Sequence, residues 1–229
     1  MIKYVDDTVF NVNADCIVNT VNCVGVMGKG LALEFALRFP ELNSLYIEDC
    51  KKNIVKPGNV YYYNIDGTKI LNFTTKNHYK DPSRYEWIEE GLKAIVNLYK
   101  KLDINSIAVP YLGCSNGGLD KNKVLKLIEK YLDLNDLIVY VCSSKKVSGV
   151  EQNMIDSFKS TDLDRLSKIV KLNYRQLDRI NENKKNINHF YDILKMPGIG
   201  IKTYKKLFDY FYNHSFNKKE AQTNIFDYL

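Results

Sequence analysis

The feature that most constrains the fold of this chain is an alternation of short apolar strands with helices along the first 144 residues. Strands are predicted at Ile2–Val5, Ile17–Asn22, Val60–Asn64, Lys69–Phe73, Ser106–Pro110 and Leu137–Cys142, and helix cores at Glu34–Arg38, Arg84–Leu102 and Asn122–Leu132. Several strands are continuously apolar, which is typical of strands covered on both faces. The pattern predicts an α/β fold, a three-layer α/β/α sandwich with a mixed, mostly parallel sheet. Asp66 and Gly67 predict a hairpin over Val60–Phe73.

Two glycine-rich loops each join a predicted strand to a helix. The first lies within Ile17–Phe39 and contains Gly25, Gly28 and Gly30, and the second is Pro110–Asp120. Glycines let backbone N–H groups approach an anion closely, and two such loops at one edge of a parallel sheet suit a diphosphate. The spacing is neither that of a dinucleotide fingerprint nor that of a Walker A loop. The alternative is a pair of tight turns that need positive φ angles.

A third segment, Asn72–Lys80, follows another predicted strand end and should lie at the rim of the same crevice. It contains Lys76. A lysine there can attack an anomeric carbon or stabilise charge if its pKa is lowered, and a nearby carboxylate would serve as acid or base. The alternative is a solvated surface lysine.

Together the segments VNTVNCVGVMGKGLALEF, NFTTKNHYKDPSR and VPYLGCSNGGLD resemble the macrodomain family over residues 1–144, and the DarG-like branch most closely. The resemblance implies a macrodomain sandwich that binds ADP-ribose and hydrolyses the glycosidic bond between ADP-ribose and its target. That target is a thymine base of DNA in DarG-like members and a protein carboxylate in a related branch. Three positions depart from the pattern: Asp6 stands where glycine is usual, Thr74 where proline is common, and Tyr79 where tryptophan is common.

The resemblance also implies roles for individual residues. Lys76 and Asp120 match the catalytic lysine and aspartate, and either a covalent or a direct-water route fits them. The residues implied to bind ADP-ribose are Asp7, Asn22, Gly28, Lys29, Gly30, Thr75, Gly113, Cys114, Ser115, Asn116, Gly117 and Gly118. Among them, Asp7 would read the adenine amino group, the Asn22 loop would hold the distal ribose, and the Gly113–Gly118 loop would hold the diphosphate. No metal and no cofactor is expected.

The rest of the chain is expected to be helical. Residues 145–160 are predicted to be a linker, residues 161–215 a DNA-binding domain, and residues 216–229 a tail. The predicted helices are Leu163–Asn181, Asn186–Lys195 and Lys202–Tyr212. All of the net charge of +6 falls after residue 144, which fits either a polyanionic partner for that part or lysines that merely cover solvated faces.

Asp192–Leu207 resembles a helix–hairpin–helix motif, which implies contact with the DNA backbone through residues 190–212. Pro197 would end the first helix, and the glycines would expose backbone N–H groups where a phosphate can sit. The residues implied to bind DNA are Gly198, Gly200, Lys202, Lys205 and Lys206. The alternative is a structural helical hairpin without DNA.

The last eight residues, Gln222–Leu229, resemble a sliding-clamp-binding peptide, although an ordinary tail is the alternative. The five cysteines form no CxxC pair, so reduced thiols are expected rather than disulfides or a zinc site. No apolar run is long enough to span a membrane, and the first residues do not form a signal peptide. The expected location is the cytoplasm, or the nucleus in a eukaryote, with no membrane partner.

We therefore expect an ADP-ribosyl glycohydrolase that removes ADP-ribose from thymidine in DNA. One alternative enzyme would release ADP-ribose from acidic residues of proteins or hydrolyse O-acetyl-ADP-ribose. A second alternative is a non-catalytic protein that binds ADP-ribose and recruits DNA repair machinery.

Overall fold

The computed structural model describes the backbone of residues 1–226 and the side chains of residues 1–215. The chain divides into two compact units, residues 1–146 and the remainder from Val147, which are described separately. The candidate clamp-binding peptide lies outside the residues whose side chains are described. Within the described residues, no helix combines the length and apolarity needed to cross a membrane.

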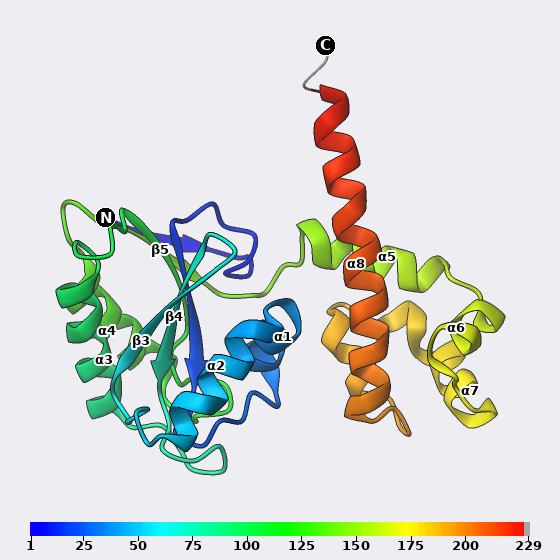
Figure 1. The fold of residues 1–229 in the computed structure, drawn as a ribbon, viewed down its shortest axis with the longest axis horizontal. Helices are drawn as coiled ribbons and strands as arrows, with labels where there is room; N and C mark the ends of the chain where they lie inside the picture. Colours follow the sequence, from blue (N-terminus) through cyan, green and yellow to red (C-terminus); the bar gives the residue numbers. More distant parts are fainter. Residues whose placement is uncertain (227–229) are drawn as a thin grey trace. The chain divides into compact units, whose positions relative to one another are not determined.

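The first unit is built on a six-stranded sheet with the order β1-β6-β5-β2-β4-β3 (Figure 1). Its strands are β1 (Ile2–Val5), β2 (Cys16–Val21), β3 (Val60–Ile65), β4 (Thr68–Thr74), β5 (Ser106–Pro110) and β6 (Ile138–Cys142). Every neighbouring pair is parallel except β3 and β4, which form the predicted hairpin. Asp66 and Gly67 both have positive φ, as the tight turn between two twisted strands requires.

Helices cover both faces of this sheet. Helices α3 (Tyr85–Leu98) and α4 (Lys121–Leu132) pack on one face, whereas α1 (Gly30–Arg38) and α2 (Pro40–Lys51) pack on the other (Figure 1). Successive residues of one strand enter different cores: Val18 packs with α3 and α4, and Ile17 packs with α1. This arrangement confirms the predicted three-layer sandwich with a mixed, mostly parallel sheet.

Helix α2 is absent from the sequence prediction, which ended its first helix core at Arg38. Pro40 stands at the first position of α2, where proline needs no hydrogen-bond donor and its fixed φ suits the helix. Leu42, Tyr46 and Cys50 recur every four residues and are buried. That spacing was a readable helix signal.

The second unit is helical, as predicted. Its elements are α5 (Gly149–Ser160), α6 (Leu163–Val170), α7 (Tyr174–Asn183), the 3₁₀ turns η1 (Lys184–Asn186) and η2 (Phe190–Lys195), and α8 (Ile201–Phe226). The predicted linker is therefore wrong over α5. Its apolar residues recur at helical spacing and are buried; they are Val150, Met154, Ile155 and Phe158.

Two further predictions for this unit are corrected. The single helix expected over Leu163–Asn181 is broken, because Lys171 adopts a left-handed conformation and Asn173 begins a new helix with a capping box to Gln176. The expected helix Asn186–Lys195 is instead the short turn η2. Asp162 caps α6, with its side chain accepting a hydrogen bond from the Arg165 N–H.

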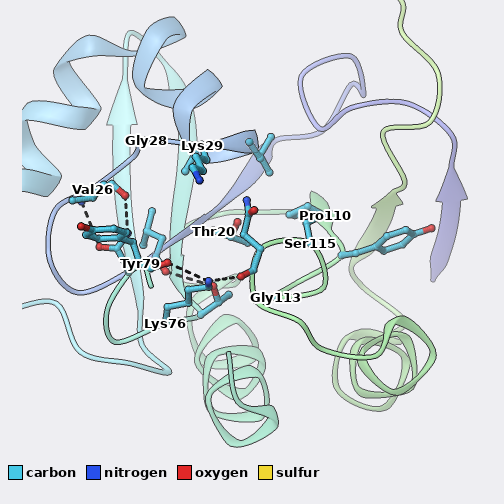
Figure 2. A pocket seen from close by; sticks show the side chains of 18 of the residues that line it. Thr20, Val26, Gly28, Lys29, Lys76, Tyr79, Pro110, Gly113 and Ser115 are labelled. Carbon is cyan, nitrogen blue, oxygen red and sulfur yellow. Dashed lines mark hydrogen bonds between the residues drawn. The ribbon is translucent and has the colours of Figure 1, made fainter. Parts of the chain in front are cut away.

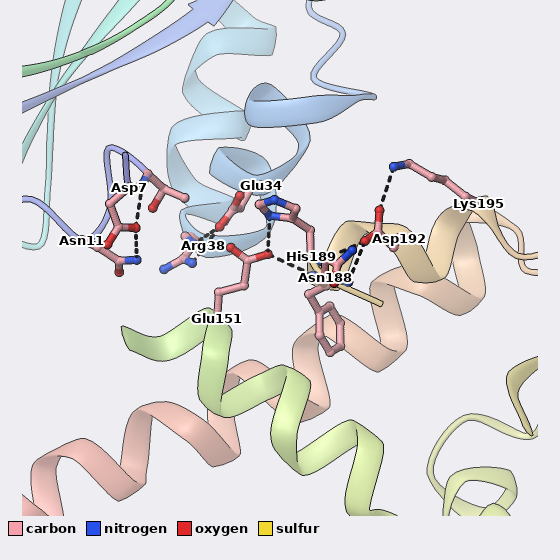
Figure 3. A network of polar contacts seen from close by, with 11 residues as sticks. Asp7, Asn11, Glu34, Arg38, Glu151, Asn188, His189, Asp192 and Lys195 are labelled. Atoms are coloured by element: carbon pink, nitrogen blue, oxygen red, sulfur yellow. Dashed lines mark hydrogen bonds and ion pairs between the residues drawn. The ribbon is translucent and has the colours of Figure 1, made fainter. Parts of the chain in front are cut away.

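An aromatic cluster around Phe190 forms the centre of the second unit. The ring of Phe190 lies about 6 Å from those of Phe158, Phe208 and Phe211, mostly edge to face. The buried carboxylate of Glu151 accepts a hydrogen bond from the Phe190 N–H at 2.9 Å, and His189 Nδ1 lies 3.4 Å from the same oxygen (Figure 3). These contacts tie α5 to η2.

Candidate active site

A cavity of about 770 Å³ opens at the carboxyl edge of the sheet (Figure 2). The parallel strands β2, β4, β5 and β6 all end there, and each contributes the residues that follow it. The lining residues are Thr20, Val21, Asn22, Val26, Gly28, Lys29, Gly30, Leu31, Ala32, Thr75, Lys76, Tyr79, Lys80, Pro110, Tyr111, Gly113, Ser115, Asn116, Gly117, Cys142, Ser143 and Ser144. The two glycine loops and the Lys76 segment thus share one crevice, as the strand order predicts.

Asn22 braces the first glycine loop from inside. Its Nδ2 donates to Val26 O at 2.6 Å, and its Oδ1 accepts from the Val24 N–H at 3.0 Å. The Asn22 carbonyl accepts from the buried Tyr46 hydroxyl at 2.6 Å. These contacts make Asn22 a structural support of the cavity wall, in addition to a lining residue.

The Lys76 segment is fastened to this first loop through the backbone. The Cys23 N–H donates to Asn77 O at 2.9 Å, and the Thr75 N–H donates to Val21 O at 3.0 Å. The Lys76 side chain is therefore presented from a fixed backbone rather than from a loop tip.

Lys76 reaches across the cavity to the second glycine loop. Its Nζ donates to Asn116 O at 2.5 Å and to Tyr79 O at 3.4 Å (Figure 2). Partial burial lowers the pKa of Lys76, against a smaller opposing effect of the Asp81 carboxylate. A lowered pKa increases the fraction of neutral amine, which is the nucleophilic form.

The cavity is cationic. Among the described residues that line it, none is an aspartate or a glutamate, and three are lysines: Lys29, Lys76 and Lys80. Such a lining suits an anionic ligand. The described residues hold no cluster of three or more His, Cys, Asp or Glu side chains that could bind a metal ion.

Ten predicted site residues line this cavity: Asn22, Gly28, Lys29, Gly30, Thr75, Lys76, Gly113, Ser115, Asn116 and Gly117. Four others lie outside the lining: Asp7, Cys114, Gly118 and Asp120. Asp120 caps α4, with its Oδ1 accepting from the Lys123 N–H at 2.9 Å. Asp7 Oδ1 accepts from the Thr8 N–H at 2.7 Å and from Asn11 Nδ2 at 2.9 Å (Figure 3).

The sequence analysis missed the wall formed by Cys142, Ser143 and Ser144. These residues follow β6, the last parallel strand, so the rule that located the other loops also applied to them. Tyr79 and Lys80 also line the cavity, although neither is among the predicted site residues. They lie three and four residues after Lys76, in a segment already placed at the rim.

In the second unit, the candidate DNA-binding residues gather where α8 begins. Gly198 has a φ of +80°, and a Cβ on Gly198 or Gly200 would meet nothing within 4 Å. Gln176 Nε2 donates to Gly198 O at 2.9 Å. The remaining candidates are exposed and share one face of α8; they are Lys202, Lys205 and Lys206.

A mostly parallel sheet between two helical layers, with a cationic cavity at its strand ends, defines the class of protein. The family model for the Macro domain matches residues 18–128. The solved macrodomain of Thermus aquaticus DarG is 38% identical, with a TM-score of 0.59; the match covers 98% of that chain and 62% of this one. The chain belongs to the macrodomain family.

Within that family, the chain is similar to bacterial proteins named DNA ADP-ribosyl glycohydrolase. The Mycobacterium tuberculosis protein is 40% identical over 160 residues, which are 66% of this chain and 46% of that protein. The Thermus aquaticus protein is 39% identical over 137 residues, which cover 58% of this chain and 38% of that protein. The chain thus spans less than half the length of these relatives. The structure of Thermosipho africanus DarTG in complex with ADP-ribose is 35% identical, with a TM-score of 0.59, over 63% of this chain and 42% of that one.

Proposed function

We propose that the protein is an ADP-ribosyl glycohydrolase that removes ADP-ribose from thymidine in DNA. The observation that carries this proposal is the amine of Lys76, which donates a hydrogen bond to Asn116 O of the second glycine loop inside a cationic cavity. The two relatives named DNA ADP-ribosyl glycohydrolase support it, because the similarity covers the residues that build this cavity.

The proposed chemistry follows from the position of Lys76. The glycine loops fix the diphosphate and the distal ribose, which orients the anomeric carbon toward the amine. As the bond to the thymine base breaks, positive charge builds on the ribose. In one route, the neutral amine of Lys76 forms a covalent bond to the anomeric carbon as the thymine base leaves, and water later hydrolyses that bond to release ADP-ribose. In the other route, water attacks the anomeric carbon directly while the amine donates a hydrogen bond to the ribose.

Asp120 is the proposed proton carrier. It stands at the end of the loop that supplies Asn116 O to Lys76, and its carboxylate raises the pKa of the neighbouring Cys114 thiol, after the larger effect of burial. Its side chain also caps α4. Asp7 is proposed to read the adenine at the other end of the cavity.

Tyr79 favours a nucleic-acid substrate over a protein substrate. It lines the cavity, its side chain is 45% exposed, and its ring lies 4.3 Å from that of His78. A partly exposed aromatic ring three residues from Lys76 suits stacking on a nucleic-acid base. A protein substrate linked through a carboxylate has no base to stack on this ring.

The second unit is proposed to bind the DNA backbone. Its candidate phosphate site combines the turn at Gly198 and Gly200 with three lysines on one exposed face of α8. Recruitment by a sliding clamp is a separate part of the proposal, supported only by the sequence of Gln222–Leu229. The proposed location of such an enzyme is the cytoplasm, or the nucleus in a eukaryote.

One observation favours a second candidate function, that of a non-catalytic protein that binds ADP-ribose. No carboxylate lines the described cavity, whereas glycoside hydrolysis ordinarily employs carboxylates. The test of Lys76 separates the two functions.

The test compares wild type with Lys76→Ala on an oligonucleotide that carries ADP-ribosylated thymidine. We expect hydrolysis to fall at least 100-fold while binding of free ADP-ribose persists, because the amine acts on the reacting carbon. Lys126→Ala, an exposed lysine on α4 outside the cavity, is the matched control and should leave hydrolysis unchanged. If wild type hydrolyses ADP-ribosylated protein and not DNA, the proposed substrate is wrong. If it binds ADP-ribose without turnover on either, the second candidate function holds.

A further inference from the structure

Ser83 lies behind the second glycine loop, at the far end of the segment that begins with Lys76. Its backbone N–H donates to Gly117 O at 2.9 Å. Lys76 Nζ donates to the neighbouring carbonyl, Asn116 O. The two ends of one segment therefore hold two consecutive carbonyls of the glycine loop.

The Ser83 side chain occupies the space that side chains would need at two loop positions. A Cβ on Gly117 would lie 2.2 Å from Ser83 Oγ, and a Cβ on Gly113 would lie 2.9 Å from Ser83 Cβ. Both distances are shorter than real Cβ contacts. The loop and Ser83 are thus closely packed, and Gly113 and Gly117 also line the cavity.

The hydroxyl of Ser83 has no partner within the described part of the chain. Ser83 is 5% exposed, and its Oγ is buried without a hydrogen bond. A buried hydroxyl without a partner destabilises a protein relative to alanine, because it loses its bonds to water on folding. The ligand-free fold therefore gives no reason for an oxygen at this position, although it gives a reason for a small side chain.

We propose that Ser83 is a positioning residue for the loop that binds the diphosphate. This proposal rests on the proposed function. A peptide unit that turns its N–H toward a phosphate directs its C=O to the opposite side, because the two bonds point in opposite directions across a planar unit. For the Gly113–Gly117 turn, the side opposite the cavity is the side of Ser83. When the loop binds a diphosphate, the Ser83 hydroxyl donates a hydrogen bond to the loop carbonyl that faces it.

The test measures the affinity of the full chain for free ADP-ribose by calorimetry and its melting temperature without ligand. Ser83→Ala should bind ADP-ribose about tenfold more weakly, because the loop loses the bond that holds its phosphate-facing shape. Its melting temperature should equal or exceed that of wild type, because an unpaired buried hydroxyl is gone. A residue that only packed the loop would lower both quantities together.

Ser215→Ala is the matched control. Ser215 is 1% exposed, and its Oγ has no partner among the residues whose side chains are described. It belongs to α8, none of whose described side chains lines the cavity. The same loss of one oxygen there should leave the affinity unchanged. If Ser83→Ala binds ADP-ribose as wild type does, or loses affinity and stability together, the proposed positioning role of the hydroxyl is wrong. The proposed function still stands in that case, provided that the wild-type protein binds ADP-ribose and hydrolyses the substrate. If wild type itself does not bind ADP-ribose, the proposed function fails.

Discussion

Asp120 has a structural role in capping a helix and a proposed role as the proton carrier. As the residue before α4 it accepts a hydrogen bond from the Lys123 N–H, and it is the last residue of the second glycine loop, outside the cavity lining. Asparagine caps helices about as well as aspartate but cannot carry a proton at neutral pH. The two roles can therefore be separated by one substitution.

Asp120→Asn should lower kcat on ADP-ribosylated DNA about 100-fold, the lower end of what general acid–base catalysis contributes. Its melting temperature should stay within about 2 °C of wild type, because the cap is kept. Steady-state kinetics and thermal unfolding measure the two effects. Asp120→Ala, which removes both cap and acid, should also lose about 1 kcal/mol of unfolding free energy. Full activity in Asp120→Asn would leave only the capping role.

Single residues were predictable where the backbone alone fixes them. Lys76 and Asn116 follow the ends of parallel strands, so strand order was enough to bring them to one edge. The direction of the Asp120 side chain was not predictable in the same way, because the helix N-terminus competes for its carboxylate. The contact between Ser83 and Gly117 depends on how a loop folds back, which no local pattern encodes.

At the scale of elements, α3 is held against the sheet by a close contact at Gly91. A Cβ there would lie 2.2 Å from the ring of Phe73, which is fully buried in β4. Gly91 thus lets the helix approach the strand that delivers Lys76 to the cavity.

Gly91→Ala should lower the unfolding free energy by about 1–3 kcal/mol, because the new methyl group forces Phe73 or the helix to shift. Urea denaturation followed by circular dichroism measures this. Gly67→Ala is a useful comparison, since Gly67 has a φ of +81° but nothing within 4 Å of its Cβ position. It should cost about 1 kcal/mol through backbone strain alone. A smaller loss in Gly91→Ala than in Gly67→Ala would contradict the proposed overpacking.

The elements predicted well are those whose apolar pattern is continuous. All six strands were located, whereas α2 and α5 were missed even though their buried residues recur at helical spacing. The break between α6 and α7 depends on the left-handed conformation of Lys171, a residue type that rarely adopts it. The capping box of Asn173 and Gln176 was the readable sign of that break.

At the scale of the whole molecule, the two compact units differ in their basic surfaces. The first contains a cationic cavity, and the second contains a basic face on α8. If the proposed division of labour is right, the two binding activities are separable within the intact chain.

Reversing the charge of Lys202, Lys205 and Lys206 to Glu should weaken binding to unmodified DNA and make it less dependent on salt. Each lost phosphate contact reduces the slope of log affinity against log salt by about 0.9. Affinity for free ADP-ribose should not change. Fluorescence anisotropy at several salt concentrations measures the effect. Reversing Lys93, Lys101 and Lys126 in the first unit is the control, and an equal loss there would show that only net charge matters.

Every cavity residue outside α1 and the glycine loops belongs to or follows the carboxyl end of a parallel strand, whereas the Asp66–Gly67 hairpin turn lies at the amino end of β4. The cavity and the hairpin turn therefore lie at opposite edges of the sheet. A change in the length of this hairpin turn would therefore leave in place the strand ends that line the cavity.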